Sequence, residues 1–407
     1  MKRLACLALL LFGVCTSFAQ SETGWSRWTV FAGNHLALDR LIASDLRLFQ
    51  ENYAIGPNDV IVQPGEMIKL LTLNLPVQFV SDLPDPRNWQ ATHNEPALDY
   101  HNTYLNLSQV IQQCETFRSN YPNLVTRQQI ATTVNGNPVW VYKLHNTNPI
   151  SGNKPPQKVI LMTFGIHARE WISESVGLYI MDNTLQEAAS DPNWLWYLTM
   201  NEIDIVPVYN PDGYDYTWNY DRYWRKNRRN NGHGNYGVDQ NRNFPVGWGG
   251  QGSSSDPSND TYRGPSAASE PETQGLLNYC SSLKSLIGFI DYHSYSELLM
   301  WPYGYTSQLC KDNSAFNALG TVMQTAIYNV NKVKYTTGPV YTTIYPAAGV
   351  TVDTMYTNYN TWAYTIELRD TGQYGFDLPT NQILPTQQEN WAGYVQLVQA
   401  LFPGIYK

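Results

Sequence analysis

Short apolar runs alternate with helical patterns along most of this 407-residue chain, and this alternation limits the folds that it can adopt. Each run is bounded by polar or glycine-containing sequence, as buried strands are. From about residue 98 onward, the alternation predicts an α/β domain with a mixed, largely parallel central sheet and helices on both faces. We expect strands at 139–144, 159–164, 203–208, 286–292 and 364–368, and helices at 107–117 and 173–185.

Residues 20–82 predict a separate small α+β module, because strand and helix patterns alternate there within few residues. The module has no cluster of histidines, cysteines or paired acids, so we assign it no chemistry of its own. Two prolines and several charges then indicate an exposed linker over 83–97. Within the module we expect strands at 28–31, 60–62 and 77–80 and helices at 36–49 and 66–73.

The first 19 residues have the pattern of a secretory signal peptide. Lys2 and Arg3 precede an apolar run, and small residues precede a cleavage point after Ala19. This run is too short to cross a bilayer, and no later segment is apolar for long enough. A net charge of −8 argues against nucleic acid or an anionic membrane as the partner. We therefore expect a secreted, extracellular monomer without a membrane span.

Five cysteines are present, and the predicted signal peptide contains Cys6 and Cys15. The remaining cysteines, Cys114, Cys280 and Cys310, permit one disulfide bond and one free thiol. Spacing does not determine connectivity. We prefer a bridge between Cys280 and Cys310.

An imidazole and a carboxylate follow the predicted strand at 159–164: His167 and Glu170, three residues apart. On the first turn of a helix, the two side chains share a face and can reach one metal ion. The spacing alone is weak, because a surface histidine beside a helix-starting glutamate gives the same pattern. Among the seven histidines, His293 also lies at the end of a predicted buried strand. Two imidazoles and one carboxylate are a ligand set of catalytic zinc, with the fourth position left to water.

Five segments combine polar, charged and aromatic residues in recognisable order: Gly165–Ser173, Tyr223–Lys226, Val238–Asn243, His293–Ser296 and Tyr364–Gly372. They resemble the successive motifs of the zinc metallocarboxypeptidases of the pancreatic carboxypeptidase A/B type. The resemblance covers residues 98–407 as the catalytic domain, and the module at 20–82 resembles that family's activation prosegment. It implies a secreted proenzyme that binds one zinc ion and removes single residues from the C-termini of peptides and proteins.

The resemblance also implies roles for individual residues. Glu367 matches the catalytic glutamate that accepts a proton from the attacking water, although an ion pair with Arg369 is the alternative. Arg225 matches the arginine that stabilises the developing oxyanion. Asp239 matches an acid that orients the first zinc-binding histidine, and the alternative is a plain turn aspartate.

Several residues match substrate-binding positions of the family. Asn241 and especially Arg242 match the groups that bind the terminal carboxylate, a task that suits a planar guanidinium. Tyr345 matches a mobile tyrosine that closes over the substrate. More distant peptide contacts are matched by Arg169, Tyr295 and Phe376.

The pocket residues indicate which C-terminal side chain is removed. Val352 matches the deepest pocket position, where an apolar residue leaves a cationic side chain unpaired and so favours aliphatic or aromatic residues. Val350 stands where the family commonly has glycine, which narrows the pocket. Asp291 stands where a small neutral residue is usual. It precedes His293 by two residues on one strand, so we expect its side chain to point toward the pocket. A basic or mixed preference therefore stays open.

Two further alternatives concern activation and activity. Arg87 is the one basic residue between Lys69 and Arg118. It is therefore either the site at which a trypsin-like protease activates the precursor or an ordinary linker residue. A catalytically inactive, peptide-binding relative is the rival from another functional class. Such proteins usually lose a ligand or the base, whereas this chain retains all four groups.

Overall fold

The computed structural model describes residues 25–44, 46–48, 56–63, 66–73, 75–83, 99–147 and 158–402. The chain divides into two compact units, residues 1–94 and 95–407, and each is described by itself. The predicted signal peptide at 1–19 and Arg87 lie outside the described residues.

The described residues of the N-terminal unit form a four-stranded sheet with two helices. All its strand pairs are antiparallel, in the order β2-β3-β1-β4. Trp28 and Val30 of β1 and Leu41 of α2 belong to its buried core. Its elements are β1 (Trp25–Ala32), α2 (His35–Ala43), β2 (Arg47–Leu48), β3 (Gly56–Val62), α3 (Met67–Thr72) and β4 (Val77–Leu83).

The helix predicted over 36–49 is too long, because α2 ends at Ala43 and β2 follows it. Ser44 explains this end. Its hydroxyl donates to the carbonyl of Leu41 at 2.6 Å and accepts from the amide of Leu46 at 3.3 Å. A serine side chain that bonds its own backbone in this way competes with helical hydrogen bonds.

The second unit is built on an eight-stranded mixed sheet in the order β13-β12-β14-β11-β7-β8-β6-β5. Its centre, β8-β7-β11-β14, is parallel, while β5, β6 and β12 add antiparallel pairs. The predicted mixed, largely parallel sheet is therefore confirmed. The strands are β5 (Val125–Thr132), β6 (Pro138–Leu144), β7 (Val159–Phe164), β8 (Glu202–Val206), β11 (Leu286–Ser294), β12 (Leu298–Trp301), β13 (Thr336–Pro339) and β14 (Trp362–Leu368).

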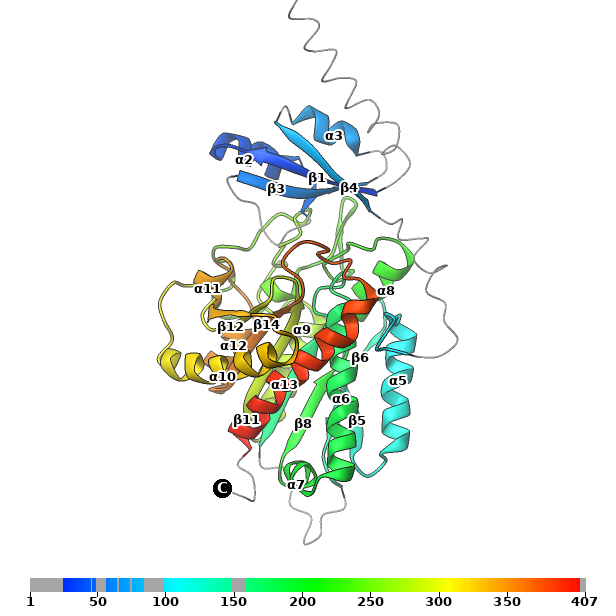
Figure 1. Cartoon of the computed structure of the whole chain (residues 1–407). Coiled ribbons are helices and arrows are strands. Elements are labelled where there is room, and N and C mark those ends of the chain that lie inside the picture. Colours follow the sequence, from blue (N-terminus) through cyan, green and yellow to red (C-terminus); the bar gives the residue numbers. More distant parts are fainter. Residues whose placement is uncertain are drawn as a thin grey trace, which may run out of the picture. The chain divides into compact units, whose positions relative to one another are not determined.

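Helices cover both faces of this sheet. Gly288 of β11 lies so close to α13 that an added Cβ would be 2.8 Å from Leu401. Asp291, on the opposite face of the same strand, contacts Thr351 of α12. In Figure 1, α6 and α13 run across the sheet side by side. The helices are α5 (Leu107–Asn120), α6 (Ile172–Ser190), α7 (Pro192–Met200), α8 (Pro211–Asn219), α9 (Pro271–Ser282), α10 (Asn313–Asn331), α11 (Val340–Thr343), α12 (Thr351–Tyr359) and α13 (Ile383–Leu401), with 3-10 turns at Gln240–Arg242 and Thr380–Gln382 and a short hairpin of β9 (Asn230–Gly232) and β10 (Asn235–Tyr236).

The carboxyl ends of the central parallel strands meet at one edge of the sheet. Strand β7 ends at Phe164, immediately before the segment with His167 and Glu170. His293, near the end of β11, is the register partner of Glu367 in β14. In open α/β sheets, ligands bind at this edge, so the fold brings the predicted site residues together there.

The cysteines correct one prediction. Cys114, Cys280 and Cys310 are all buried and free, so the preferred bridge between Cys280 and Cys310 is not formed. The Cys280 thiol on α9 instead faces the Met355 sulfur of α12 at 3.8 Å. No helix within the described ranges is both long and apolar enough to span a bilayer.

Candidate metal centre

A tight turn after β7 carries His167 and Glu170. Gly165 opens this turn at φ +67°, and a Cβ there would lie 2.1 Å from Glu174 Oε1, so both conformation and space require glycine. The amide of Glu170 donates to the carbonyl of His167 at 3.2 Å, and helix α6 begins only at Ile172. The two residues therefore lie in the turn before the helix, and the turn brings their side chains together as a first helical turn would.

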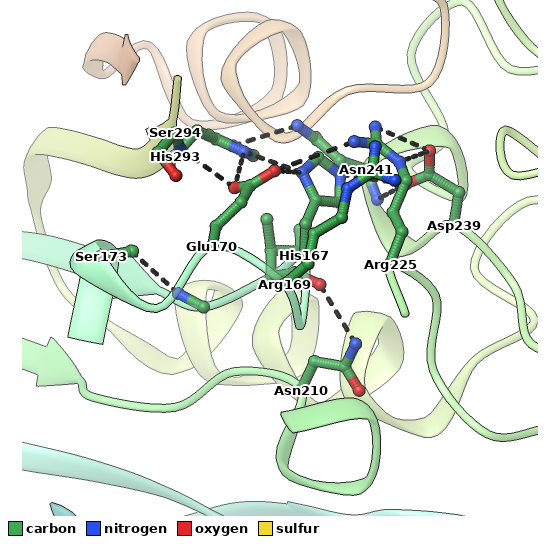
Figure 2. Close-up of polar contacts among 12 residues, drawn as sticks. His167, Arg169, Glu170, Ser173, Asn210, Arg225, Asp239, Asn241, His293 and Ser294 are labelled. Atoms are coloured by element: carbon green, nitrogen blue, oxygen red, sulfur yellow. Dashed lines mark hydrogen bonds and ion pairs between the residues drawn. The ribbon is translucent and has the colours of Figure 1, made fainter. Parts of the chain in front are cut away.

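His167, Glu170 and His293 converge on one point, as Figure 2 shows. Nδ1 of His167 is 2.7 Å from Glu170 Oε1 and 3.1 Å from Nδ1 of His293, which is 3.2 Å from Glu170 Oε2. Ligand atoms around a tetrahedral zinc ion are about 3.3 Å apart, close to these separations. All three side chains are buried. Two imidazoles and a carboxylate in this arrangement suit a zinc ion.

Glu170 is ionised at this site. Burial alone would raise its pKa, but the adjacent imidazoles of His167 and His293 hold the pKa of Glu170 below its usual value. Its Oε2 also accepts from the amide of Ser294 at 3.2 Å. A carboxylate that stays ionised can serve as a metal ligand over the whole neutral range.

Asp239 lies behind His167 on the side away from the converging atoms. Its Oδ1 is 3.3 Å from Nε2 of His167, and its Oδ2 accepts from Nε and Nη2 of Arg225, each at 3.1 Å (Figure 2). Burial would raise the pKa of Asp239, but Arg225 and Arg242 hold it below its usual value. A buried, ionised carboxylate therefore faces the outer nitrogen of His167.

Asp291 lies on the predicted face of β11, but it is not one of the described residues that line the substrate pocket. Its carboxylate lies deeper, 3.0 Å from Nε2 of His293. Burial lowers the pKa of His293, whereas the carboxylates of Asp291 and Glu170 raise it, and the net result is a raised pKa. Asp291 therefore lies behind His293 and Thr351, which line the pocket, and its carboxylate contacts the histidine.

Glu367 lies next to His293 across the β11–β14 pair, is buried and lines the pocket. The alternative role of Glu367 was an ion pair with Arg369, but that arginine pairs with another carboxylate. Arg369 Nε donates to Glu389 Oε1 of α13 at 2.9 Å. The Glu367 carboxylate instead belongs to the pocket lining.

A pocket opens beside the three converging side chains. Asn241 and Arg242 lie at its polar side, where Arg242 Nε donates to the carbonyl of Gly252 at 2.7 Å. Val350 and Val352 are buried in its apolar wall, and Tyr345 is half-buried beside them. The full lining is His167, Asn241, Arg242, His293, Met300, Val340, Ile344, Tyr345, Ala347, Val350, Thr351, Val352, Thr365 and Glu367.

Three predicted peptide contacts form a separate group. The guanidinium of Arg169 stacks 4.2 Å from the centre of the Phe376 ring, and Tyr295 packs edge-on against the same ring at 5.1 Å. Arg169 Nη1 also lies 3.3 Å from Asp260 Oδ2. Arg225 is buried on Asp239, with Nη1 3.8 Å from Glu170 Oε1. Within the described part of the chain, the pocket lining does not include Arg169, Tyr295, Phe376 or Arg225.

Sequence reasoning missed several lining residues. Thr365 precedes Glu367 by two residues on β14. Side chains two apart on a strand point to the same face, so the assignment of Glu367 to the site also predicts Thr365 there. Met300 is the register partner of Thr365 on β12, a pairing that no local pattern reveals. Thr351 also lines the pocket, between the predicted pocket residues Val350 and Val352.

Comparison with known proteins places the chain in a family. Residues 110–393 match the family model Peptidase_M14, described as zinc carboxypeptidase. The chain is 35% identical over 341 residues to carboxypeptidase A4 of Mus musculus, covering 83% of this chain and 80% of the relative. It is 37% identical over 290 residues to carboxypeptidase B of Canis lupus familiaris, covering 71% and 68%.

Solved structures agree with this assignment. The structure of thrombin activatable fibrinolysis inhibitor matches with a TM-score of 0.81 and 26% identity, over 93% of this chain and 98% of that chain. A carboxypeptidase A from Helicoverpa armigera has the same fold, with a TM-score of 0.78 and 24% identity, over 93% and 98%. The chain therefore belongs to the zinc carboxypeptidase family, and it is a metallocarboxypeptidase that acts at peptide C-termini.

Proposed function

We propose that this protein is a secreted zinc carboxypeptidase, made as a precursor, that removes single aliphatic or aromatic residues from peptide C-termini. The observation that carries this proposal is an apolar pocket directly beside the His167, Glu170 and His293 side chains. An apolar side chain gains free energy by entering such a pocket, while the adjacent polar groups act on the peptide bond.

The ligands of the zinc ion are His167, Glu170 and His293. When bound, zinc lowers the pKa of a water molecule and polarises the carbonyl group that is attacked. Glu367 accepts a proton from the attacking water and later donates it to the leaving amine. Arg225 stabilises the negative charge that develops on the carbonyl oxygen, and its Nη1, 3.8 Å from Glu170 Oε1, is near enough to serve this role.

The terminal carboxylate of the substrate is bound by Asn241 and Arg242, which lie at the polar side of the pocket. Tyr345 closes over the bound residue from the loop after α11. Arg169, Tyr295 and Phe376 contact substrate residues further from the C-terminus, and Arg169 and Tyr295 both pack on the Phe376 ring.

Specificity for an apolar residue follows from the pocket wall. Among the described residues, Glu367 is the only acid that lines the pocket. A lysine or arginine side chain would therefore be desolvated beside Val350 and Val352 without a dedicated partner. Asp291, which favoured the alternative basic preference, already contacts His293 and two threonine hydroxyls. We therefore favour the aliphatic or aromatic preference over the basic one.

Secretion and activation follow from the N-terminal sequence. We assign 1–19 as a signal peptide, 20–82 as an activation prosegment, 83–97 as the linker and 98–407 as the catalytic domain. A trypsin-like protease that cuts after Arg87 would release the prosegment. The inactive, peptide-binding alternative is disfavoured, because three metal ligands and Glu367 are all present at one site.

A peptide panel tests this function. The activated protein is incubated with otherwise equal peptides that end in Phe, Leu, Arg or Glu, and we expect release of Phe and Leu. A chelator or an amidated C-terminus should abolish release. Glu367→Gln should lose at least about 100-fold in turnover while it retains zinc, since it removes the proton acceptor and leaves the ligands unchanged. Preferred release of Arg would contradict the specificity, and unchanged turnover of Glu367→Gln would remove it from the mechanism.

A further inference from the structure

Asp291 lies where a carboxylate can act on the metal site without contacting the substrate. It is fully buried on β11, two residues before His293, and its Oδ2 is 3.0 Å from Nε2 of that histidine. His293 lines the pocket, whereas Asp291 does not among the described residues. Asp291 can therefore act on the reaction only through the residues that it contacts, His293 foremost among them because it is a proposed metal ligand.

Two hydroxyl groups hold the Asp291 carboxylate in place. Thr163 Oγ1 of β7 donates to its Oδ1 at 2.6 Å, and Thr351 Oγ1 of α12 donates to its Oδ2 at 2.5 Å. These donors come from two different elements packed on β11. A carboxylate bonded from both sides has a fixed orientation, so the direction from which it contacts the imidazole is fixed as well.

The contacts determine which ring nitrogen of His293 carries the proton. Nδ1 faces Glu170 Oε2 and the other histidine, while Nε2 faces Asp291 and, at 3.2 Å, Nδ2 of Asn241. The amide of Thr351 donates to Asn241 Oδ1 at 2.9 Å, which turns the NH₂ group of Asn241 toward the ring. The NH₂ group of Asn241 would favour a lone pair on Nε2, whereas the carboxylate of Asp291 can only accept and requires a proton there. The carboxylate contact is the shorter one and is charged and fully buried, so it decides between the two. Nε2 is therefore protonated toward Asp291, and the Nδ1 lone pair faces the metal position.

The other histidine of the site has a different arrangement. Asp239 contacts Nε2 of His167 at 3.3 Å, but it also accepts two hydrogen bonds from Arg225, so its charge is shared with a cation. The contacts of Asp291 are with neutral hydroxyls and the imidazole. Asp291 is thus the carboxylate whose charge acts more directly on its histidine, and this increases the basicity of the ligand nitrogen.

We propose that Asp291 is a positioning residue of the metal centre, which orients His293 and keeps its Nδ1 available as the ligand atom. Each histidine of the site then has its own buried carboxylate. This inference rests on the ligand set of the proposed function. It assigns to Asp291 the retention of zinc and assigns it no contact with the substrate.

The test measures zinc binding by the full chain, without reference to activity. Asp291→Asn keeps the size of the side chain but removes its charge and can present an NH₂ group to the ring. We expect its zinc dissociation constant, measured by competition with a coloured chelator, to rise about 10- to 100-fold. The visible spectrum of the cobalt-substituted protein should also change, because it reports the ligand geometry. Asp204→Asn is the matched control: Asp204 is buried in β8 of the same sheet and accepts from the hydroxyl of Tyr279 at 2.5 Å.

The outcomes separate this inference from the proposed function. Wild-type zinc affinity and cobalt spectrum in Asp291→Asn would overturn the role of Asp291, and so would an equal loss in Asp204→Asn. If Asp291→Asn does not fold, Thr163→Val removes one of the two fixing hydroxyls and should still weaken zinc binding, whereas unchanged binding counts against the inference. His293→Ala tests the ligand set itself: if this variant binds zinc like the wild type, the proposed metal site is wrong.

Discussion

Val350 is the residue through which the size of the pocket can be changed most directly. It is buried in the lining, and its Cγ2 would be 3.2 Å from a Cβ placed on Gly304, so it packs tightly in the wall. Val350→Ala should widen the pocket and raise kcat/KM for C-terminal Phe relative to Leu by about tenfold, the range that one or two methyl groups provide. Kinetics on paired peptides that differ only in the last residue measure this ratio. Val350→Ile is the control and should shift the ratio the other way, and an unchanged ratio in both variants would show that Val350 does not limit size.

For single residues, sequence periodicity predicted which way a side chain points better than it predicted what the side chain does. The period-2 rule correctly placed Asp291 and His293 on one face of β11, as their direct contact shows. The rule did not predict that the Asp291 carboxylate lies behind the His293 ring, because that position depends on hydrogen bonds from Thr163 of β7 and Thr351 of α12. Met300 was missed for the same reason, since it reaches the pocket through its pairing with Thr365 on another strand.

The turn between β7 and α6 depends on one glycine. Gly165 has φ +67°, and the carboxyl group of Glu174 occupies the space that a Cβ would need. Gly165→Ala should lower the free energy of unfolding by more than about 1 kcal/mol, because it adds steric overlap to an unfavourable φ. It should also weaken zinc binding, since the turn carries His167 and Glu170. Denaturant unfolding and chelator competition measure the two effects.

A second variant separates the two causes of this loss. Glu174→Ala in the Gly165→Ala background removes the overlap but leaves the positive φ, so it should restore only part of the stability. Gly177→Ala is the control on α6, where an added Cβ would meet the Phe164 ring at 2.9 Å, away from the ligands. It should reduce stability with little effect on zinc affinity. Wild-type stability and zinc affinity in Gly165→Ala would show that the turn does not need glycine.

At the element scale, apolar runs predicted strands well and helix ends less well. The strand predicted at 159–164 is β7 itself, because all six of its residues are buried and polar or glycine-containing sequence bounds the run. The helix predicted at 36–49 ends earlier, at Ala43, because the hydroxyl of Ser44 donates to the backbone carbonyl of Leu41. The helix predicted at 173–185 begins at Ile172, so His167 and Glu170 lie in the turn before it, and a spacing of three residues fits such a turn as well as a helix.

For the whole molecule, Glu272 should make stability depend on pH. It is buried in α9, and burial, together with the nearby carboxylates of Glu270 and Asp212, raises its pKa from 4.5 to about 7. Between these values the folded protein keeps a proton that the unfolded chain releases, so this contribution to stability is present at low pH and is lost as the pH rises to 7. Glu272→Gln has no carboxyl group at this position, so its stability does not fall with pH for this reason. Relative to the wild type, its free energy of unfolding should therefore rise by up to about 3 kcal/mol between pH 5 and pH 8.

Denaturant unfolding of both proteins at the two pH values measures this difference. Subtraction of the wild-type curve removes the titrations that the two proteins share, so the remaining pH dependence belongs to position 272. A difference that does not change with pH, or that falls as the pH rises, would mean that the Glu272 carboxyl is ionised in the folded protein throughout this range.

Activation also concerns the whole chain, because it would separate the N-terminal unit from the catalytic unit. Brief treatment with trypsin should cut after Arg87, yield a fragment that begins at Asn88 and increase peptide hydrolysis. Arg87→Gln should resist this cut and stay at the activity of the uncut protein. Lys69→Gln is the matched control and should be activated normally, since Lys69 lies in helix α3 of the N-terminal unit, where a folded backbone resists proteolysis.

Mass spectrometry of the fragments, followed over time beside the hydrolysis rate, shows which cleaved bond accompanies the rise in activity. If Arg87→Gln is activated as fast as the wild type, the activating cut lies elsewhere, and if the uncut protein is already fully active, the N-terminal unit does not inhibit.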